Sequence, residues 1–137
     1  MSGLLANVLV PVANVEDARS TAAALARYDP DRVTVIHVVE KGGGAPDKTP
    51  VEQSEGIAAE SFDAFRETFP DAATEMRYDD DIVGAVFDAA REMDASAVVF
   101  LPRGGSRWVQ LLSGDRTLAL VTETDRPVVA LPGGADA

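Results

Sequence analysis

The segment SAVVFLP, residues 96–102, is an apolar, β-branched run that stops at a proline. Continuous apolar runs of this length are typical of strands that are buried on both faces of a parallel sheet. Glycines and arginines follow the run, and a second apolar run, RPVVALP, occupies residues 126–132. We expect a helix between them over DRTLALVTETD, residues 115–125. The last third of the chain therefore predicts a strand–helix–strand unit.

The same alternation continues toward the N-terminus. Buried strands are predicted over Asn7–Val12 and Arg32–Val39, and Thr74–Tyr78 is short and alternating, as an outer strand would be. Helices are expected over 16–28, 51–69 and 79–93. Five strands alternating with four helices predict an α/β fold over residues 1–137, one domain with an open parallel sheet and helices on both faces.

Each of these three helices has an apolar stripe at helical spacing, which we expect to pack into the core rather than to hold a ligand. The stripe residues are Ala18, Ala22, Leu25 and Ala26 in the first helix, Ala58, Phe62, Phe65 and Phe69 in the second, and Ile82, Val86, Ala89 and Met93 in the third. Asp79, Asp80 and Asp81 open the third helix, where capping and the helix dipole favour acidic residues over a metal site. Residues 40–53, rich in glycine and proline, are predicted to be a mobile loop, with a flap as the alternative.

The composition limits the classes of partner. The chain has 137 residues, no cysteine and a formal net charge of −11, so disulfides and thiolate metal sites are excluded. An acidic surface repels nucleic acid and anionic membranes, and we expect neither as a partner. No apolar run is long enough to span a membrane, and a cytoplasmic protein is expected. Abundant acid with two lysines resembles proteins of salt-loving organisms and predicts a halophilic archaeal source.

Candidate chemistry lies where the strands end. Ligands of open parallel sheets bind beyond the carboxyl ends of the strands, so candidate residues here follow Val12, Val39 and Pro102. After Pro102 come two glycines, three arginines and a predicted helix start, a combination that attracts anions such as phosphate. The phosphate-loop motif G-x-x-x-x-G-K-[ST] and the dinucleotide fingerprint G-x-G-x-x-G are both absent from the sequence.

The order of elements, VLVPV near the start, VIHVV in the second strand and the final LLSGDRTLALVTETDRPVVALP resemble the universal stress protein (UspA-like) family. The resemblance covers nearly the whole chain. It implies the adenine nucleotide alpha hydrolase-like fold, a sheet in the order 3-2-1-4-5, and a homodimer. Many members of the family bind ATP through G-x2-G-x9-G-[ST], whereas others lack that motif and do not bind ATP.

The resemblance carries part of that motif onto this chain. Gly104 and Gly114 match the second and third glycines, whereas Leu101 stands at the first glycine and Asp115 at the hydroxyl position. Ala13 stands where an aspartate often follows the first strand. The residues expected around a nucleotide are Pro11, Val12, Ala13, Val38, Arg103, Gly104, Gly105, Gly114, Asp115 and Arg116.

Asp115 is the most consequential of these changes. A carboxylate at this position repels a polyphosphate and could itself cap the following helix. Arg103, Arg107 and Arg116 could compensate, and Mg²⁺ could bridge the carboxylate to a phosphate. Weak binding of ATP or AMP, with Mg²⁺, therefore stays open, and no other cofactor or metal is expected.

The remaining residues favour no enzyme. His37, the single histidine, is interpreted as a hydrogen-bonded core group, because no serine or aspartate nearby completes a triad. Trp108 is expected to pack over the sheet end, with a surface that binds an unknown protein partner as the alternative. The resemblance implies that the strand at 127–132 pairs with its copy in a dimer, since it would lie at the sheet edge. We therefore expect a non-enzymatic stress-response homodimer with a degraded nucleotide site; the alternative is a nucleotide-dependent switch with slow or no hydrolysis.

Overall fold

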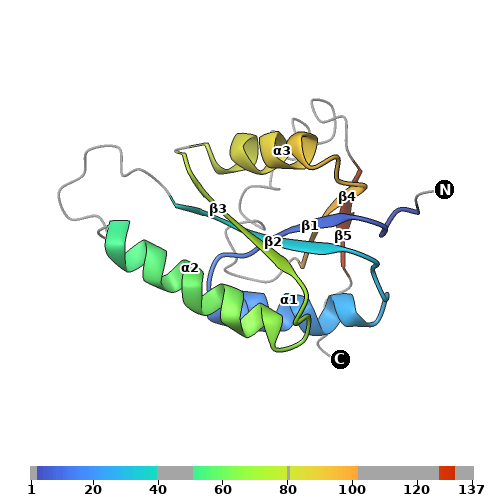
Figure 1. The fold of residues 1–137 in the computed structure, drawn as a ribbon, viewed down its shortest axis with the longest axis horizontal. Coiled ribbons are helices and arrows are strands. Elements are labelled where there is room, and N and C mark those ends of the chain that lie inside the picture. Colours follow the sequence, from blue (N-terminus) through green and yellow to red (C-terminus); the bar gives the residue numbers. More distant parts are fainter. Residues whose placement is uncertain (1–2, 40–50, 80, 102–126, 132–137) are drawn as a thin grey trace.

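The strands lie side by side in one parallel sheet (Figure 1). The computed structural model describes residues 3–39, 51–79, 81–101 and 127–131. Its elements, in chain order, are β1 (Val8–Pro11), α1 (Val15–Ala26), β2 (Val33–Val39), α2 (Val51–Arg66), β3 (Ala73–Tyr78), α3 (Ile82–Glu92), β4 (Ala97–Phe100) and β5 (Val128–Ala130). The predicted helix over 115–125 lies outside the described residues.

The sheet has the order β3-β2-β1-β4-β5, and every pairing is parallel. In the register Val8 faces Val33 of β2 on one side and Ala97 of β4 on the other, so β1 lies at the centre. The predicted α/β fold and its strand order are confirmed. Strand β3 is at one edge, as predicted, although its six residues make it longer than β1, β4 and β5, and β5 is at the other edge.

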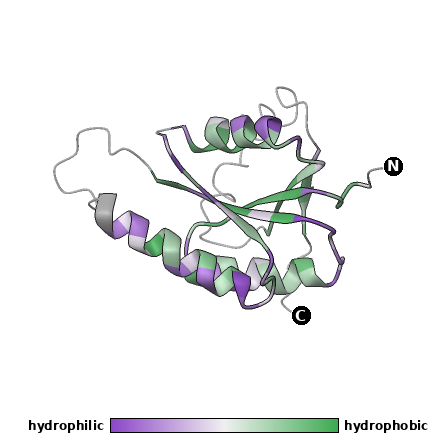
Figure 2. Cartoon of the chain, viewed as in Figure 1, coloured by the Kyte–Doolittle hydropathy of each residue, from purple (hydrophilic) through white to green (hydrophobic). Residues whose placement is uncertain are grey.

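Alternate residues of the central strands face two separate hydrophobic clusters. Val8 and Val10 pack with α1 and α2 on one face, where Leu25 and Phe65 are fully buried. Leu9 packs with α3 on the opposite face. Figure 1 shows these helix layers, and in Figure 2 the hydrophobic colour follows β1 through the centre of the sheet. The carboxyl ends of β1, β2 and β4 therefore meet at one edge between two packed layers.

The helices differ from the prediction mainly at their ends. Ala26 is exposed and Ala24 is buried in its place, because α1 turns its last residue toward solvent. Phe69 lies beyond the end of α2, where it is half-buried and its ring stacks on Phe65 with centroids 5.4 Å apart. Residues 51–53 fell in both the predicted loop and the predicted helix over 51–69, and they belong to α2, whose predicted start at Val51 is confirmed. The rest of that loop, 40–50, lies outside the described residues.

The start of α3 confirms the predicted capping role for Asp81, with Asp79 supporting the same turn, whereas Asp80 lies outside the described residues. The Asp81 carboxylate accepts a hydrogen bond from the Gly84 N–H at 3.0 Å, and the Asp79 carboxylate accepts one from the Asp81 N–H at 3.0 Å. Each bond satisfies a backbone donor that the helix itself leaves unpaired. Among the described residues, no group of three acidic, histidine or cysteine side chains is placed to hold a metal ion.

Strand β2 is less buried than its apolar sequence predicted. Val35, Ile36 and Val39 are buried, whereas the side chains between them are half-buried. The reason is the place of β2 in the sheet: one neighbour is the central β1, and the other is the polar edge strand β3.

Candidate functional site

The carboxyl edge of the sheet brings together the site residues predicted near β1, β2 and β4. The Val12 N–H donates to the Ile36 carbonyl at 3.0 Å, which continues the pairing of β1 with β2 past Pro11. Val38 lies two residues further along β2, half-buried on the α3 face of the sheet. Pro11, Val12, Ala13 and Val38 are therefore close neighbours at the edge where open parallel sheets bind ligands.

The turn after β1 is closed by its own side chains. Asn14 caps α1, and its side-chain oxygen accepts from the Asp17 N–H at 2.8 Å. The Asp17 carboxylate reaches back and accepts from the Ala13 N–H at 2.8 Å and from the Thr21 hydroxyl at 3.3 Å. This reciprocal arrangement resembles a capping box, shifted by one residue. It places a carboxylate that is 9% exposed at the positive end of α1.

Asp17 is a site residue that the sequence analysis missed. The spacing of Asn14 and Asp17 follows the pattern of a capping residue followed three positions later by an acid, and it precedes the apolar stripe of α1. That signal was present in the sequence. It is a helix-start signal, however, and nothing in it predicts that the carboxylate turns back to Ala13.

His37 is bonded to the same edge. Its Nδ1 lies 3.0 Å from the Val12 carbonyl oxygen. A carbonyl only accepts, so Nδ1 carries the proton and donates. The predicted hydrogen-bonded role is confirmed, although the ring is half-buried rather than enclosed in the core.

Leu101 is a core residue in this structure. It is 4% exposed and belongs to the cluster on the α1 and α2 face, together with Val12 and Leu131. The Leu131 N–H donates to the Phe100 carbonyl at 2.8 Å, which fixes the chain after β5 beside the end of β4. The bulk of Leu101 therefore fills apolar space on the α1 and α2 face of the sheet, at the end of β4.

The remaining predicted residues cannot be placed against this edge. Arg103, Gly104, Gly105, Arg107, Trp108, Gly114, Asp115 and Arg116 lie outside the described residues. The described part of the site thus consists of the end of β1, the start of α1, the end of β2 and Leu101.

A model of the universal stress protein family matches residues 5–132, nearly the whole chain. The chain belongs to the universal stress protein family. No curated protein matches it. No helix among the described residues is both long and apolar enough to cross a membrane.

Solved universal stress proteins share the fold at low sequence identity. One from Archaeoglobus fulgidus, in complex with dAMP, is 18% identical with a TM-score of 0.63 and covers 95% of this chain and 100% of its own. UspA from Lactobacillus plantarum is 23% identical with a TM-score of 0.61, covering 93% and 98%. A third, in complex with cAMP, is 14% identical with a TM-score of 0.59, covering 94% and 99%. The adenine nucleotide alpha hydrolase-like fold implied by the resemblance is thereby confirmed.

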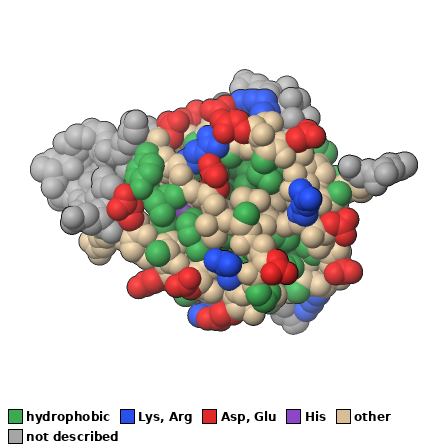
Figure 3. Space-filling view, in the orientation of Figure 1, with side chains coloured by type: hydrophobic (Ala, Val, Ile, Leu, Met, Phe, Trp, Pro, Cys, Tyr) green, Lys and Arg blue, Asp and Glu red, His purple; other side chains and the backbone are tan. Residues whose placement is uncertain are grey.

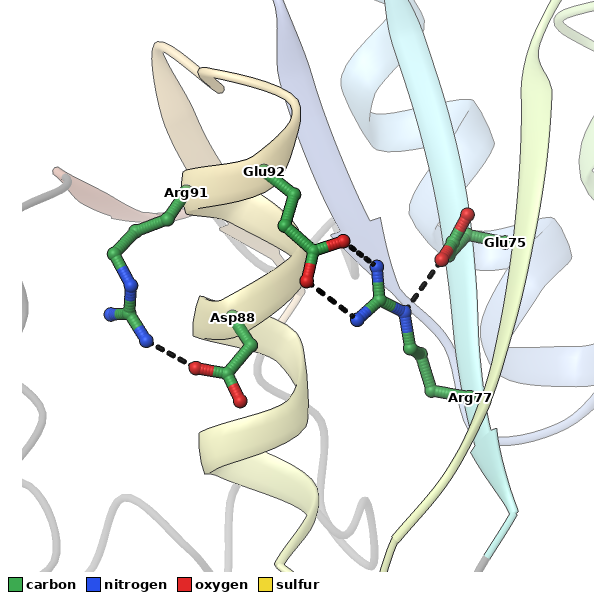
Figure 4. Close-up of polar contacts among 5 residues, drawn as sticks. All are labelled: Glu75, Arg77, Asp88, Arg91 and Glu92. Carbon is green, nitrogen blue, oxygen red and sulfur yellow. Dashed lines mark hydrogen bonds and ion pairs between the residues drawn. The ribbon is translucent and has the colours of Figure 1, made fainter.

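An ion-pair network lies beside the Val38 position of this universal stress protein. Arg77 of β3 is opposite Val38 in the register. Its guanidinium donates to Glu75 at 2.6 Å and to both carboxylate oxygens of Glu92 at 2.7 and 3.2 Å (Figure 4). Arg91 pairs separately with Asp88 on the side of α3 turned away from Arg77.

The network shifts the acidity of its members. The hydrogen bond to Arg77 holds the pKa of the Glu92 carboxyl below its usual value, and the hydrogen bonds to Glu92 and then Glu75 raise the pKa of Arg77. Because Arg77 is neutralised by two acids, it adds no net positive charge near the site. Figure 3 shows the wider setting: acidic side chains outnumber basic ones on the visible face.

Proposed function

We propose that this universal stress protein is a non-enzymatic, cytoplasmic regulatory homodimer whose nucleotide site no longer holds a triphosphate tightly. The observation that carries the proposal is the closure of the turn after β1, where the Asp17 carboxylate bonds the Ala13 N–H at 2.8 Å. In a ligand-binding turn, that N–H and the positive end of α1 would be open to an anion. Here the Asp17 carboxylate accepts from the Ala13 N–H and also occupies the positive end of α1.

The sequence supports the same proposal through a second carboxylate, that of Asp115. Asp115 stands where the family motif has a hydroxyl that bonds phosphate. Two negative charges at the predicted site would oppose a polyphosphate by simple Coulomb repulsion. Leu101, at the position of the first glycine, is held in the core by its contacts on the α1 and α2 face.

The absence of catalysis is part of the proposal, and His37 supports it. His37 is the only histidine of the chain, and the bond from its Nδ1 to the Val12 carbonyl gives it a structural role. A general base must instead reach the proton it removes from a substrate.

A nucleotide-dependent switch is the second candidate function. It is favoured by Gly104 and Gly114 at the family spacing and by the neighbouring arginines. It is also favoured by relatives of the same fold that were solved with dAMP and with cAMP. In this candidate Mg²⁺ would bridge Asp115 to the phosphates.

Titration calorimetry with ATP and AMP, with and without Mg²⁺ and at high KCl concentration, separates the two candidates. The degraded site predicts a Kd above about 1 mM for both nucleotides. Micromolar binding of either nucleotide would instead establish the switch. High salt is needed because it screens the general repulsion by the acidic surface and leaves the contacts within the site to decide the affinity.

Variants test whether Asp115 is the cause. Asp115→Ser restores the family hydroxyl, and we expect it to tighten ATP binding at least about fivefold, since one unit charge at contact distance opposes a phosphate by about 1 kcal/mol or more. Asp63→Ser is the matched control, because it removes the same charge from an exposed position on α2. Equal gains in both variants would show that net charge, and not the site, controls binding.

The dimer is proposed through residues 127–132. β5 is an edge strand that pairs with β4 on one side, and its two valines are half-buried. An apolar edge gains most from pairing with a copy of itself. Light scattering should give the mass of two chains, and the mass of one chain would contradict this part of the proposal.

A further inference from the structure

The outer edge of β3 presents backbone groups to a second strand. β3 pairs with β2 on one side and ends the sheet on the other. The Asp79 N–H donates to the Val39 carbonyl at 3.0 Å. Backbone groups alternate sides along a strand, so the odd-numbered residues of β3 bond to β2 and the even-numbered ones face outward. The outward-facing residues are Thr74, Met76 and Tyr78.

The charged residues of β3 are arranged so that the strand is complementary to an antiparallel copy of itself. Glu75 and Arg77 flank Met76 symmetrically. Their side chains are on the α3 face of the sheet, 37% and 26% exposed, and the bonds to Glu75 and Glu92 use three of the five guanidinium N–H groups of Arg77. Charged residues usually protect an edge strand from pairing with another strand. An acid and a base placed two residues apart disfavour the registers that bring like charges together, but not the register that brings opposite charges together.

We propose that two copies of this chain pair antiparallel through β3, around a two-fold axis at Met76. In this register Met76 is opposite Met76 of the second copy, and Thr74 is opposite Tyr78, so that all the outward-facing N–H and C=O groups are paired. Glu75 then lies opposite Arg77 of the second copy, in the closer, non-hydrogen-bonded type of pair. Tyr78, which is 43% exposed in one copy, is covered by the second strand.

Electrostatics selects this register over its neighbours. A two-fold axis at residue 75 would place Glu75 against Glu75, and an axis at residue 77 would place Arg77 against Arg77. Like charges directly opposite each other are destabilising in antiparallel pairs. The axis at Met76 forms two opposite-charge pairs instead.

Salt should promote this pairing. Each copy has a net charge of −11, and α2, which lies beside β3, exposes Glu60 and Asp63. The repulsion between two such copies acts over the Debye length, which shrinks from about 10 Å at 0.1 M salt to about 3 Å at 1 M. The Glu75–Arg77 contacts are shorter-ranged and are screened less.

The inference goes beyond the proposed function and is independent of it. β3 and β5 are opposite edges of the sheet, so the copy paired at β3 is not the copy proposed at 127–132. If both interfaces form, the sheets join into longer assemblies. A probe attached to β3 reports on this edge whether or not β5 pairs and whether or not a nucleotide binds.

Cysteine cross-linking tests the pairing, because the chain has no cysteine of its own. Met76→Cys should form an intermolecular disulfide under mild oxidation at 1 M KCl or above, since facing residues in such a pair have Cα atoms about 5.5 Å apart. Thr74→Cys is the matched control on the same edge. In the proposed register its two copies are four residues apart along the strand, roughly 13 Å, too far for a disulfide.

Charge exchange provides the second arm, carried out in the Met76→Cys background. Glu75→Arg alone and Arg77→Glu alone should each abolish the cross-link, because like charges then face each other. The double variant Glu75→Arg/Arg77→Glu should restore it. Circular dichroism and thermal unfolding of each variant confirm that the fold is intact.

Three results would overturn the inference. The first is a folded Met76→Cys protein that forms no dimer, and the second is equal cross-linking of Met76→Cys and Thr74→Cys. The third is a mixed disulfide with an added cysteine peptide of unrelated extended sequence that forms as readily as the self-dimer. That result would make the edge a general acceptor of strands.

Discussion

At the scale of single residues, Arg77 forms ion pairs with two carboxylates, those of Glu75 and Glu92. It joins β3 to α3 through a two-pronged bond to Glu92, the last residue of the helix, and it also binds Glu75 on its own strand (Figure 4). A guanidinium that meets a carboxylate with two parallel bonds forms one of the stronger charged contacts in proteins. Because the Glu92 side chain is exposed, we expect this contact to change the pKa of Glu92 more clearly than it changes the free energy of unfolding.

Removing the guanidinium should raise the pKa of Glu92. The lowered pKa of Glu92 arises first from its hydrogen bond with Arg77, and Arg91 contributes least. Arg77→Gln should therefore move the pKa of Glu92 up toward its usual value, whereas Arg91→Gln should change it far less. A carboxyl titration followed by NMR measures both, and an unchanged Glu92 in Arg77→Gln would contradict the contact.

The lowered pKa of Glu92 determines whether its contact with Arg77 stabilises the fold at high or at low pH. Glu92 has a lower pKa in the folded chain than in the unfolded chain, so its contact stabilises the fold above the unfolded pKa. That contribution is lost as the pH falls through the folded pKa. Arg77→Gln should therefore make the stability depend less on pH in the acidic range.

At the scale of elements, the helix starts show how local chemistry sets the structure. Gly84, in the first turn of α3, donates to the Asp81 cap, and a Cβ added at Gly84 would lie 2.5 Å from Asp81 Oδ2. Gly56 is in the interior of α2, and a Cβ added there would have nothing within 4 Å. The same substitution should therefore have different effects on stability at the two glycines.

Gly56→Ala should stabilise the protein by roughly 1 kcal/mol, the usual gain for alanine over glycine in a helix. Gly84→Ala should give no gain, because the new methyl group displaces a cap that contributes about 1 kcal/mol. In an Asp81→Ala background, where no cap is left to lose, Gly84→Ala should recover the gain. Urea unfolding of the four variants measures this, and a full gain from Gly84→Ala alone would contradict the capping geometry.

The sequence predicted the elements of this fold better than their contacts. The apolar runs within Asn7–Val12 and 96–102 favoured buried strands, which the structure has at Val8–Pro11 and Ala97–Phe100, and the alternation of element types implied parallel crossovers. The contact of Asp17 with Ala13 could not be predicted, because capping spacing marks where a helix starts but not which donor a carboxylate selects. Likewise, the exposure of Ala26 depends on the position of α1 against α2, which spacing within one helix does not determine.

At the scale of the whole molecule, the acid excess should govern stability. A net charge of −11 on 137 residues favours expansion through self-repulsion, and screening removes that cost. We therefore expect Tm to rise continuously with KCl into the multimolar range. Each kcal/mol gained should raise Tm by about 4 °C in a domain of this size.

Sucrose at matched osmolarity is the control for the salt experiment. It strengthens burial by exclusion from the protein surface but screens no charge. A Tm in multimolar KCl no higher than in dilute buffer would show that the acidic surface is not an adaptation to salt. An equal rise in sucrose would show that screening is not the cause.

The central claim is that carboxylates of the chain itself take the place of phosphate at the carboxyl edge of the sheet. The most direct measurement is the electron density of a crystal grown with ATP and Mg²⁺. We predict no triphosphate at Gly104 and Gly114, with the Asp115 carboxylate bonded to backbone N–H groups and Asp17 still bonded to Ala13. A well-ordered triphosphate lying against Asp115, directly or through Mg²⁺, would contradict the claim.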